Sequence, residues 1–106
     1  MKNEKDLQEM QILEQNMQSL LMQRQTFQLE LSETQSALKE LENSSEEVYK
    51  IVGNLMIKSD KSKIKNDLLD KEKIINLRVK TLEKQEGFLM DKLEKLREKI
   101  INSEKK

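Results

Sequence analysis

The segment VYKIVGNLMIK, residues 48–58, decides the fold of this chain. Its opening residues, Val48–Val52, are rich in the β-branched and aromatic side chains that favour a strand. Gly53 and Asn54 match a two-residue hairpin turn with glycine in the first position. Leu55–Lys58 then supply the returning strand. The sequence therefore predicts a single β-hairpin near the middle of the chain.

Both faces of the predicted hairpin are apolar. Because strand side chains alternate, the apolar residues divide into Val48, Val52, Leu55 and Ile57 on one face, and Tyr49, Ile51 and Met56 on the other. A hairpin alone is marginally stable, and its outer edges leave backbone groups unpaired. We therefore expect strands of other chains to extend it, with these residues and Gly53 as the oligomerisation surface. The alternative is a hairpin folded back on its own helices, where Ile64 and Leu68 would cover one face but not both.

Heptad repeats flank the hairpin on both sides, which indicates a long antiparallel two-helix coiled coil. The seam before the hairpin consists of Met10, Leu13, Met17, Leu20, Arg24, Phe27, Leu31, Thr34, Leu38 and Leu41. The seam after it consists of Leu68, Glu72, Ile75, Val79, Leu82, Glu86, Leu89, Leu93, Leu96 and Ile100. We expect one mainly α unit over residues 1–106, with a helix at 1–43, a loop and hairpin at 44–59, and a helix at 60–106. Ser59 or Asp60 is the expected N-cap of the second helix.

Register and charge both favour pairing of the two helices. Opposed residues of an antiparallel pair have numbers with a constant sum, and a sum of 106 matches the seams from Met10 opposite Leu96 to Leu38 opposite Leu68. A slip of one heptad would also keep the seams paired but would leave overhanging ends. Residues 1–43 carry a net charge of −4 and residues 60–106 a net charge of +4. One exposed pair contributes only about 0–1 kcal/mol, but many together favour unlike halves as partners. The competing interpretation is two solvated faces whose imbalance has no consequence.

The composition excludes most catalytic and ligand chemistry. The chain has no Cys, no His and only two Gly, so thiolate and imidazole ligands, the usual general base and a Gly-rich phosphate loop are missing. We expect no enzyme activity, no metal and no cofactor. Basic and acidic residues number 20 each, which argues against nucleic-acid binding. No apolar run approaches the roughly 18 residues of a membrane span, and residues 1–6 lack a signal-peptide pattern, so we expect a cytoplasmic protein with no membrane partner.

A second candidate surface lies toward the chain ends. Apolar residues outside the seams occur at Leu7, Ile12, Leu21, Met22, Phe88, Met90 and Ile101. The register places all of them in the half of the coil farthest from the hairpin, where exposed apolar and methionine side chains favour binding of varied partners. The predicted surface also includes nearby seam residues: Met10, Leu13, Met17, Leu20, Leu89, Leu93, Leu96 and Ile100. For Met10 and Met17, ordinary seam packing is the favoured interpretation, and both roles can coexist near the ends of the helices.

The order of helix, VYKIVGNLMIK hairpin and helix resembles the β class of the prefoldin (GimC) family. The stretch RVKTLEKQEGFLMDKLEKLREKI, residues 78–100, is similar to the family's second helix, with Leu82, Lys84, Gln85 and Glu86 in matching places. A single hairpin and the short length fit the β class rather than the longer α class. The resemblance covers essentially the whole chain, and the hairpin is its more specific part.

The resemblance implies a chaperone subunit that acts without ATP. It implies a hexamer of two α and four β subunits whose hairpins build a β-barrel platform. It also implies that the coiled-coil tips hold unfolded client proteins and pass them to a group II chaperonin in the cytosol. Two alternatives stay open: a structural or scaffolding coiled coil, and a binding module like a tubulin-folding cofactor. Suppression of aggregation of a denatured protein without ATP would separate a chaperone from a scaffold.

Overall fold

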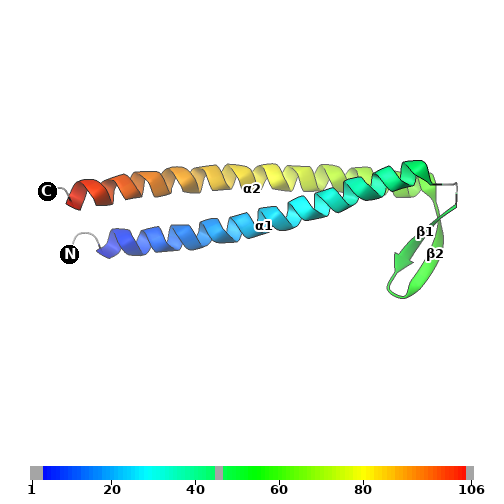
Figure 1. Ribbon diagram of the computed structural model, residues 1–106, viewed down its shortest axis with the longest axis horizontal. Helices are drawn as coiled ribbons and strands as arrows, with labels where there is room; N and C mark the ends of the chain where they lie inside the picture. The colour runs from blue at the N-terminus through cyan, green and yellow to red at the C-terminus, as the bar shows by residue number, and fades with distance from the viewer. Residues whose placement is uncertain (1–3, 45–46, 105–106) are drawn as a thin grey trace. The chain divides into compact units, whose positions relative to one another are not determined.

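The structure is a computed structural model that describes residues 4–44 and 47–104. Over these residues the element order is α1 (Glu4–Asn43), β1 (Glu47–Val52), β2 (Leu55–Asp60) and α2 (Lys61–Glu104), as Figure 1 shows. This order confirms the predicted mainly α fold, in which one hairpin joins two long helices. The predicted loop residues Ser45 and Glu46 lie outside the described residues.

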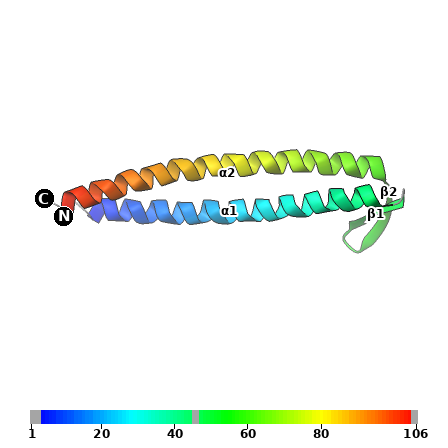
Figure 2. The ribbon, with the colours of Figure 1, turned by 45° about the horizontal axis from the view of Figure 1, so that its top comes forward.

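The chain forms two compact units. The terminal unit combines Met1–Thr26 with Val79–Lys106, and the hairpin unit is Phe27–Arg78. Each unit contains one segment of α1 beside one segment of α2 (Figures 1 and 2). The helices contain no proline, and their many Leu, Gln, Glu and Lys residues favour helix formation.

Cross-helix ion pairs show that the helix segments of the terminal unit are antiparallel. Asp6 pairs with Lys99 at 3.5 Å and Arg24 pairs with Glu86 at 2.7 Å. As the residue number rises along α1, the residue number of the paired residue in α2 falls. The predicted register places Asp6 opposite Ile100, one residue from its observed partner. The start of α1 and the end of α2 accordingly lie together (Figure 2).

The heptad seams form the core of each unit. Every member of the two predicted seams is buried or half-buried, and the positions between them are mostly exposed. Leu82 and Leu93 of the terminal unit are 7% and 6% exposed, and Ile75 and Thr34 of the hairpin unit are 3% exposed each. The Thr34 hydroxyl donates to the Glu30 carbonyl at 2.8 Å, so this polar seam residue keeps a hydrogen-bond partner. The heptad prediction is therefore confirmed.

The hairpin contains the predicted turn. β1 and β2 pair antiparallel, with Val52 opposite Leu55 on either side of the turn. Gly53 has a φ of +61°, whereas Asn54 has no positive φ. This combination defines a type II′ turn, whose twist matches that of the paired strands. Both strands are slightly longer than predicted, because β1 begins at Glu47 and β2 ends at Asp60.

Hydrogen bonds close the helix ends next to the hairpin. The backbone N–H of Ser62 donates to Oδ1 of Asp60 at 3.1 Å, so Asp60 rather than Ser59 makes the N-cap bond of α2. Nζ of Lys61 donates to the Ser44 carbonyl, just beyond the end of α1, at 3.1 Å. The base of α2 is thereby tied to the end of α1, and the hairpin emerges between them.

Candidate assembly and binding surfaces

The hairpin exposes apolar side chains on both faces. The register confirms the predicted faces, because Val52 pairs with Leu55 and Ile51 with Met56. The exposed fractions are 51% for Tyr49, 71% for Ile51, 50% for Val52, 67% for Leu55, 70% for Met56 and 48% for Ile57. A hairpin folded onto its own helices would bury one of these sets. Within the described residues, neither set is buried as a whole by the chain itself.

Val48 is the exception among the predicted hairpin residues. It is only 9% exposed, and its cross-strand partner Ser59 is half-buried. The base of the hairpin is therefore covered on the face that Val48 shares with Val52. Gly53 lies at the opposite end, in the turn, and a Cβ atom added there would meet no atom within 4 Å. The exposed apolar surface thus extends from the turn toward the base without including Val48.

The outer edges of the hairpin leave backbone groups available for further strands. In a two-residue hairpin, the pair beside the turn exchanges hydrogen bonds, and bonded and non-bonded pairs then alternate. Counting from Val52 and Leu55, the outward-pointing N–H and C=O groups belong to Tyr49 and Ile51 on β1 and to Met56 and Lys58 on β2. An extended strand could pair with either edge by backbone hydrogen bonds.

Part of the predicted tip surface is exposed in the terminal unit. The exposed fractions are 46% for Leu7, 58% for Ile12, 65% for Met22, 70% for Phe88, 47% for Met90 and 45% for Ile101. Leu21 is half-buried. These side chains lie outside the seam, as the sequence predicted, and they leave apolar surface on both helices of this unit. We refer to the six exposed residues as the tip surface.

The seam residues that were predicted for the same surface have a different place. Leu93, Leu96 and Ile100 are buried. The others are half-buried: Met10, Leu13, Met17, Leu20 and Leu89. These residues lie in the seams, which agrees with the packing interpretation of Met10 and Met17, and their part in client binding stays a prediction.

A shallow groove runs beside the seam in the terminal unit. Its volume is about 390 Å³, and it is lined by Glu9, Leu13, Lys92, Lys95, Leu96 and Lys99. Lys99 pairs with Asp6, whose side chain is 14% exposed. The groove thus has a partly apolar floor and a basic rim supplied by α2.

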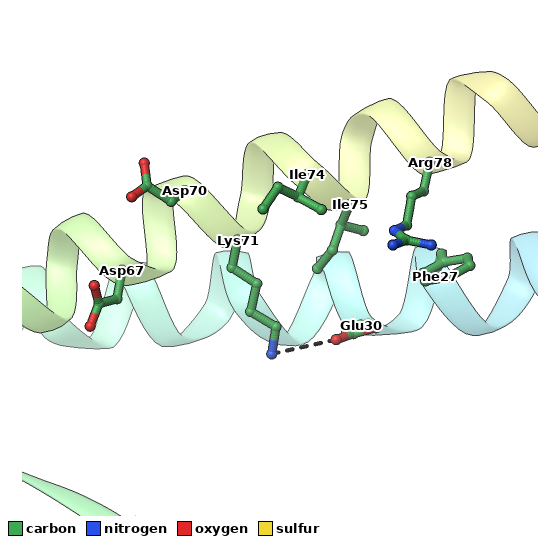
Figure 3. Close-up of a pocket in the computed structure, with 8 residues that line it drawn as sticks. All are labelled: Phe27, Glu30, Asp67, Asp70, Lys71, Ile74, Ile75 and Arg78. Carbon is green, nitrogen blue, oxygen red and sulfur yellow. Dashed lines mark ion pairs between the residues drawn. The ribbon is translucent and has the colours of Figure 1, made fainter.

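A second groove, in the hairpin unit, is shown in Figure 3. Its volume is about 440 Å³, and it is lined by Phe27, Glu30, Asp67, Asp70, Lys71, Ile74, Ile75 and Arg78. Lys71 pairs with Glu30 at 3.4 Å, and the Arg78 guanidinium lies 5.6 Å from the centroid of the Phe27 ring. These two contacts bridge α1 and α2, which are antiparallel in this unit as well.

Sequence reasoning missed exposed apolar residues in the hairpin unit. Leu29, Ile74 and Leu77 are 62%, 55% and 65% exposed, and Leu69 is 37% exposed. The sequence could have identified them, since all four are apolar residues at helix positions outside the seams, where most residues are polar. Exposed apolar side chains on the helices are therefore not confined to the terminal unit, and any binding experiment must compare the two units.

The seam of the terminal unit contains a partly buried ion pair. Nε of Arg24 donates to Oε1 and Oε2 of Glu86 at 2.7 Å and 3.0 Å. The side chains of Arg24 and Glu86 are 23% and 16% exposed. Both residues were placed in the seams from sequence, but their direct contact was not predicted.

The described residues show no metal centre and no membrane-spanning helix. Within residues 4–44 and 47–104, no group of three or more His, Cys, Asp or Glu side chains is arranged to hold a metal ion. In the same part of the chain, neither helix has a stretch apolar enough to cross a bilayer.

Comparison with known proteins gives one consistent family. A family model described as "Prefoldin subunit" matches residues 4–105. The prefoldin subunit beta of Saccharolobus islandicus (strain L.S.2.15 / Lassen #1) is 40% identical over 92 residues, which cover 85% of this chain and 73% of that protein. The prefoldin subunit beta of Thermococcus onnurineus (strain NA1) is also 40% identical, over 89 residues that cover 82% of this chain and 77% of the relative.

Solved structures agree with the sequence relatives. The crystal structure of the prefoldin beta subunit from Thermococcus strain KS-1 aligns with a TM-score of 0.89 at 34% identity, and the match covers 96% of this chain and 91% of that chain. The prefoldin beta2 subunit from the same strain aligns with a TM-score of 0.72 at 19% identity, which shows a shared fold.

Proposed function

This chain belongs to the prefoldin family of chaperones, and from that premise we propose that it is a β-class subunit of an ATP-independent holdase. In this proposal the chain binds unfolded proteins and delivers them to a group II chaperonin in the cytoplasm. The proposal assigns assembly to the hairpin and client binding to the tip surface. It requires no catalytic residue, metal or cofactor.

The proposed assembly is a hexamer of two α-class and four β-class subunits that forms a β-barrel platform. The observation that supports it is the hairpin with apolar side chains exposed on both faces, from 48% for Ile57 to 71% for Ile51. Strands added at the β1 and β2 edges would satisfy the outward-pointing backbone groups, and closure into a barrel would leave no edge. Strands of other subunits, packed as a second layer against the hairpin, would cover the apolar faces.

Client binding is proposed for the tip surface of the terminal unit. Unfolded proteins expose apolar side chains, and burial of apolar area contributes about 25 cal/mol per Å². Phe88 and Met22, at 70% and 65% exposure, are the most accessible members. Methionine side chains are flexible and fit varied partners. Each tip binds weakly alone, and several tips on one platform bind more strongly because linked sites raise the effective concentration.

The experiment compares two sets of serine substitutions in a complex assembled with an α-class subunit. The tip variant changes Leu7, Ile12, Phe88, Met90 and Ile101 to Ser. The matched control changes Leu29, Leu69, Ile74 and Leu77 of the hairpin unit, which are also exposed apolar residues. Both variants keep the seams and the hairpin. We expect both to elute as intact complexes, and only the tip variant to lose most of its suppression of aggregation of a denatured protein without ATP.

The other outcomes each change the assignment. Loss of suppression in the control but not in the tip variant would move the client surface to the hairpin unit. If the tip variant fails to assemble, the tip surface is structural. Failure of the unmodified complex to suppress aggregation would favour the scaffolding alternative over the holdase.

A further inference from the structure

The groove of the hairpin unit has an acidic rim on α2. Asp67, Asp70 and Ile74 line the groove from this helix, and all three side chains are exposed (Figure 3). The two basic side chains of the groove already contact residues of α1. Within residues 4–44 and 47–104, neither aspartate has an ion-pair partner. In this unit α2 therefore presents two unpaired carboxylates beside an exposed isoleucine.

The groove of the terminal unit has the opposite charge on its α2 rim. Lys92 and Lys95 line it, both are exposed, and neither has an ion-pair partner among the described residues. Phe88 lies about one helical turn before Lys92 and is 70% exposed. The carboxylate that lines this groove, Glu9, comes from α1 rather than α2. In this unit α2 therefore presents two unpaired ammonium groups beside an exposed phenylalanine.

The acidic and basic sides of α2 have matching spacings when they are read in opposite directions. The two aspartates precede Ile74 by four and seven residues, and the two lysines follow Phe88 by four and seven residues. At 100° per residue, each set of three stays within about 60° of the helix circumference. Two antiparallel helix segments would thus bring unlike charges together, whereas parallel contact of like segments would oppose like charges. The opposed residues are Ile74 with Phe88, Asp70 with Lys92, and Asp67 with Lys95.

We propose that this side of α2 in the hairpin unit docks the terminal unit of a second copy of the same chain. The docking surface is Asp67, Asp70 and Ile74, and the second copy contributes Phe88, Lys92 and Lys95. The chain carries both halves of the contact, so a second copy satisfies the charge and the spacing together. Exposed ion pairs contribute little and are screened by salt, and only one apolar pair is covered, so a single contact is weak.

The second copy belongs to a different complex, a point that rests on the proposed function. Copies whose hairpins share one platform would extend their helices to the same side of it, so their α2 helices would not run antiparallel to one another. Several copies in each complex can make the contact at once, and linkage strengthens weak contacts. Because Phe88 also belongs to the tip surface, the contact would cover part of the proposed client surface while no client is bound.

The test mixes two complexes, each assembled beforehand with an α-class subunit that lacks cysteine. One complex carries Leu77→Cys and the other Gln85→Cys, at positions that are opposed in the proposed register. A short thiol-specific cross-linker joins them, and mass spectrometry separates the 77–85 product from the 77–77 and 85–85 products. The chain itself has no cysteine, so no other thiol of the chain reacts. The control replaces Leu77→Cys by Asn76→Cys, which is exposed but lies about 100° around α2.

The unmodified mixture should show the 77–85 product in excess. We expect it to exceed the 77–77 and 85–85 products, and the 76–85 product of the control, about fivefold or more. Raising the salt concentration should lower this excess, because the ion pairs are exposed.

Charge reversals test the aspartates and lysines directly. Asp67→Lys/Asp70→Lys in the Leu77→Cys complex opposes like charges, and so does Lys92→Glu/Lys95→Glu in the Gln85→Cys complex. The two reversals together restore unlike pairs at the contact that the cross-linker reports. We expect each reversal alone to lower the 77–85 product about tenfold or more, because juxtaposed like charges oppose association. The combination should return it to within about twofold of the unmodified level, which also rules out misfolding as the cause of the loss.

Three results would overturn the proposal. The first is a 77–85 product no more abundant than the control, which would leave this face to a different partner or to solvent. The second is a product that the reversals do not change, and the third is a loss that the combination does not restore. Native mass spectrometry checks each complex before mixing. A chain that does not assemble would contradict the proposed function, and the same cross-linking of free chains would still decide whether the contact forms.

Discussion

Gly53 and Gly87 differ in backbone conformation, although both have open space around them. Gly53 has a φ of +61°, in the left-handed region that disfavours other residues, whereas Gly87 lies within α2. A Cβ atom built at either position meets no atom within 4 Å. Any effect of adding a methyl group is therefore conformational rather than steric.

Alanine substitutions at the two glycines should change stability in opposite directions. Gly53→Ala forces a side chain into the left-handed region and should destabilise the hairpin by about 1–2 kcal/mol. Gly87→Ala removes chain freedom from the unfolded state and should stabilise the helix by about 0.4–1 kcal/mol. Urea unfolding of the assembled complex measures both. The same sign for the two substitutions would show that the turn geometry is not what requires glycine.

Ile51 is the hairpin residue at which a charge should interfere most with assembly. It is 71% exposed in the single chain, so Ile51→Asp removes little packing within the chain itself. Assembly would bury the carboxylate without a partner, at a cost of several kcal/mol. We expect the variant to fail to form the complex with an α-class subunit when its mass is measured. Ile51→Val is the control that should assemble, and normal assembly of Ile51→Asp would exclude this face from the interface.

At the scale of single elements, packing of the seams outweighs surface charge. The ion pairs Glu47–Lys58 and Glu30–Lys71 have well-exposed side chains, whereas the seam residues of both helices are buried or half-buried. Exposed pairs contribute little and are screened by salt. The opposite net charges of the two sequence halves therefore assist pairing without supplying most of its free energy.

Salt should consequently have a small effect on the helices. Exposed charges are screened over about 10 Å at 0.1 M salt. We expect helicity of the complex, measured by circular dichroism, to decrease only slightly between low and high salt. Unfolding of the helices at moderate salt would show that exposed charge, rather than the seams, dominates the pairing.

The N-cap of α2 gives a second prediction at this scale. Asp60 accepts a hydrogen bond from the Ser62 backbone, where α2 begins. Asp60→Ala should destabilise the complex by about 1 kcal/mol, because the helix loses its cap. Ser59→Ala is the matched control and should change the free energy of unfolding much less. Equal losses in urea unfolding would mean that the two residues share the capping role.

At the scale of the whole molecule, the hairpin has apolar side chains and strand edges that the described residues of this chain leave uncovered. Its six exposed apolar side chains and its open edges have no cover among the described residues of this chain. An isolated hairpin is marginally stable, and exposed strand edges promote association. If partner subunits cover the hairpin as proposed, the free subunit should be the less stable form.

The isolated chain and the mixed complex should differ in mass distribution. We expect the chain alone to self-associate heterogeneously or to unfold easily. Addition of an α-class subunit should yield one discrete species with the mass of two α and four β chains. Native mass spectrometry measures both samples, and Ile51→Asp serves as the control that stays unassembled. A stable monomer that ignores the α-class subunit would contradict the assembly role of the hairpin.

The sequence by itself determined the elements of this protein. Seam positions such as Leu82 and Ile75 are recognisable because a heptad spacing places them on one side of a helix. The hairpin is recognisable because Gly53 permits a φ that other residues avoid. Resemblance to a known family added the expected assembly and client binding. These inferences use neighbouring residues or a regular spacing, and such local patterns are visible without a structure.

Only the tertiary structure decided which distant side chains meet and which remain exposed. The contact of Arg24 with Glu86, the burial of Val48 and the exposure of Leu77 are of this kind. The seam pattern placed Arg24 and Glu86 in the core stripe, but a long side chain can turn toward solvent or reach along the partner helix. Which of these two orientations the side chain adopts depends on ångström-scale distances between segments far apart in the sequence. Those distances are set only when the helices pack together.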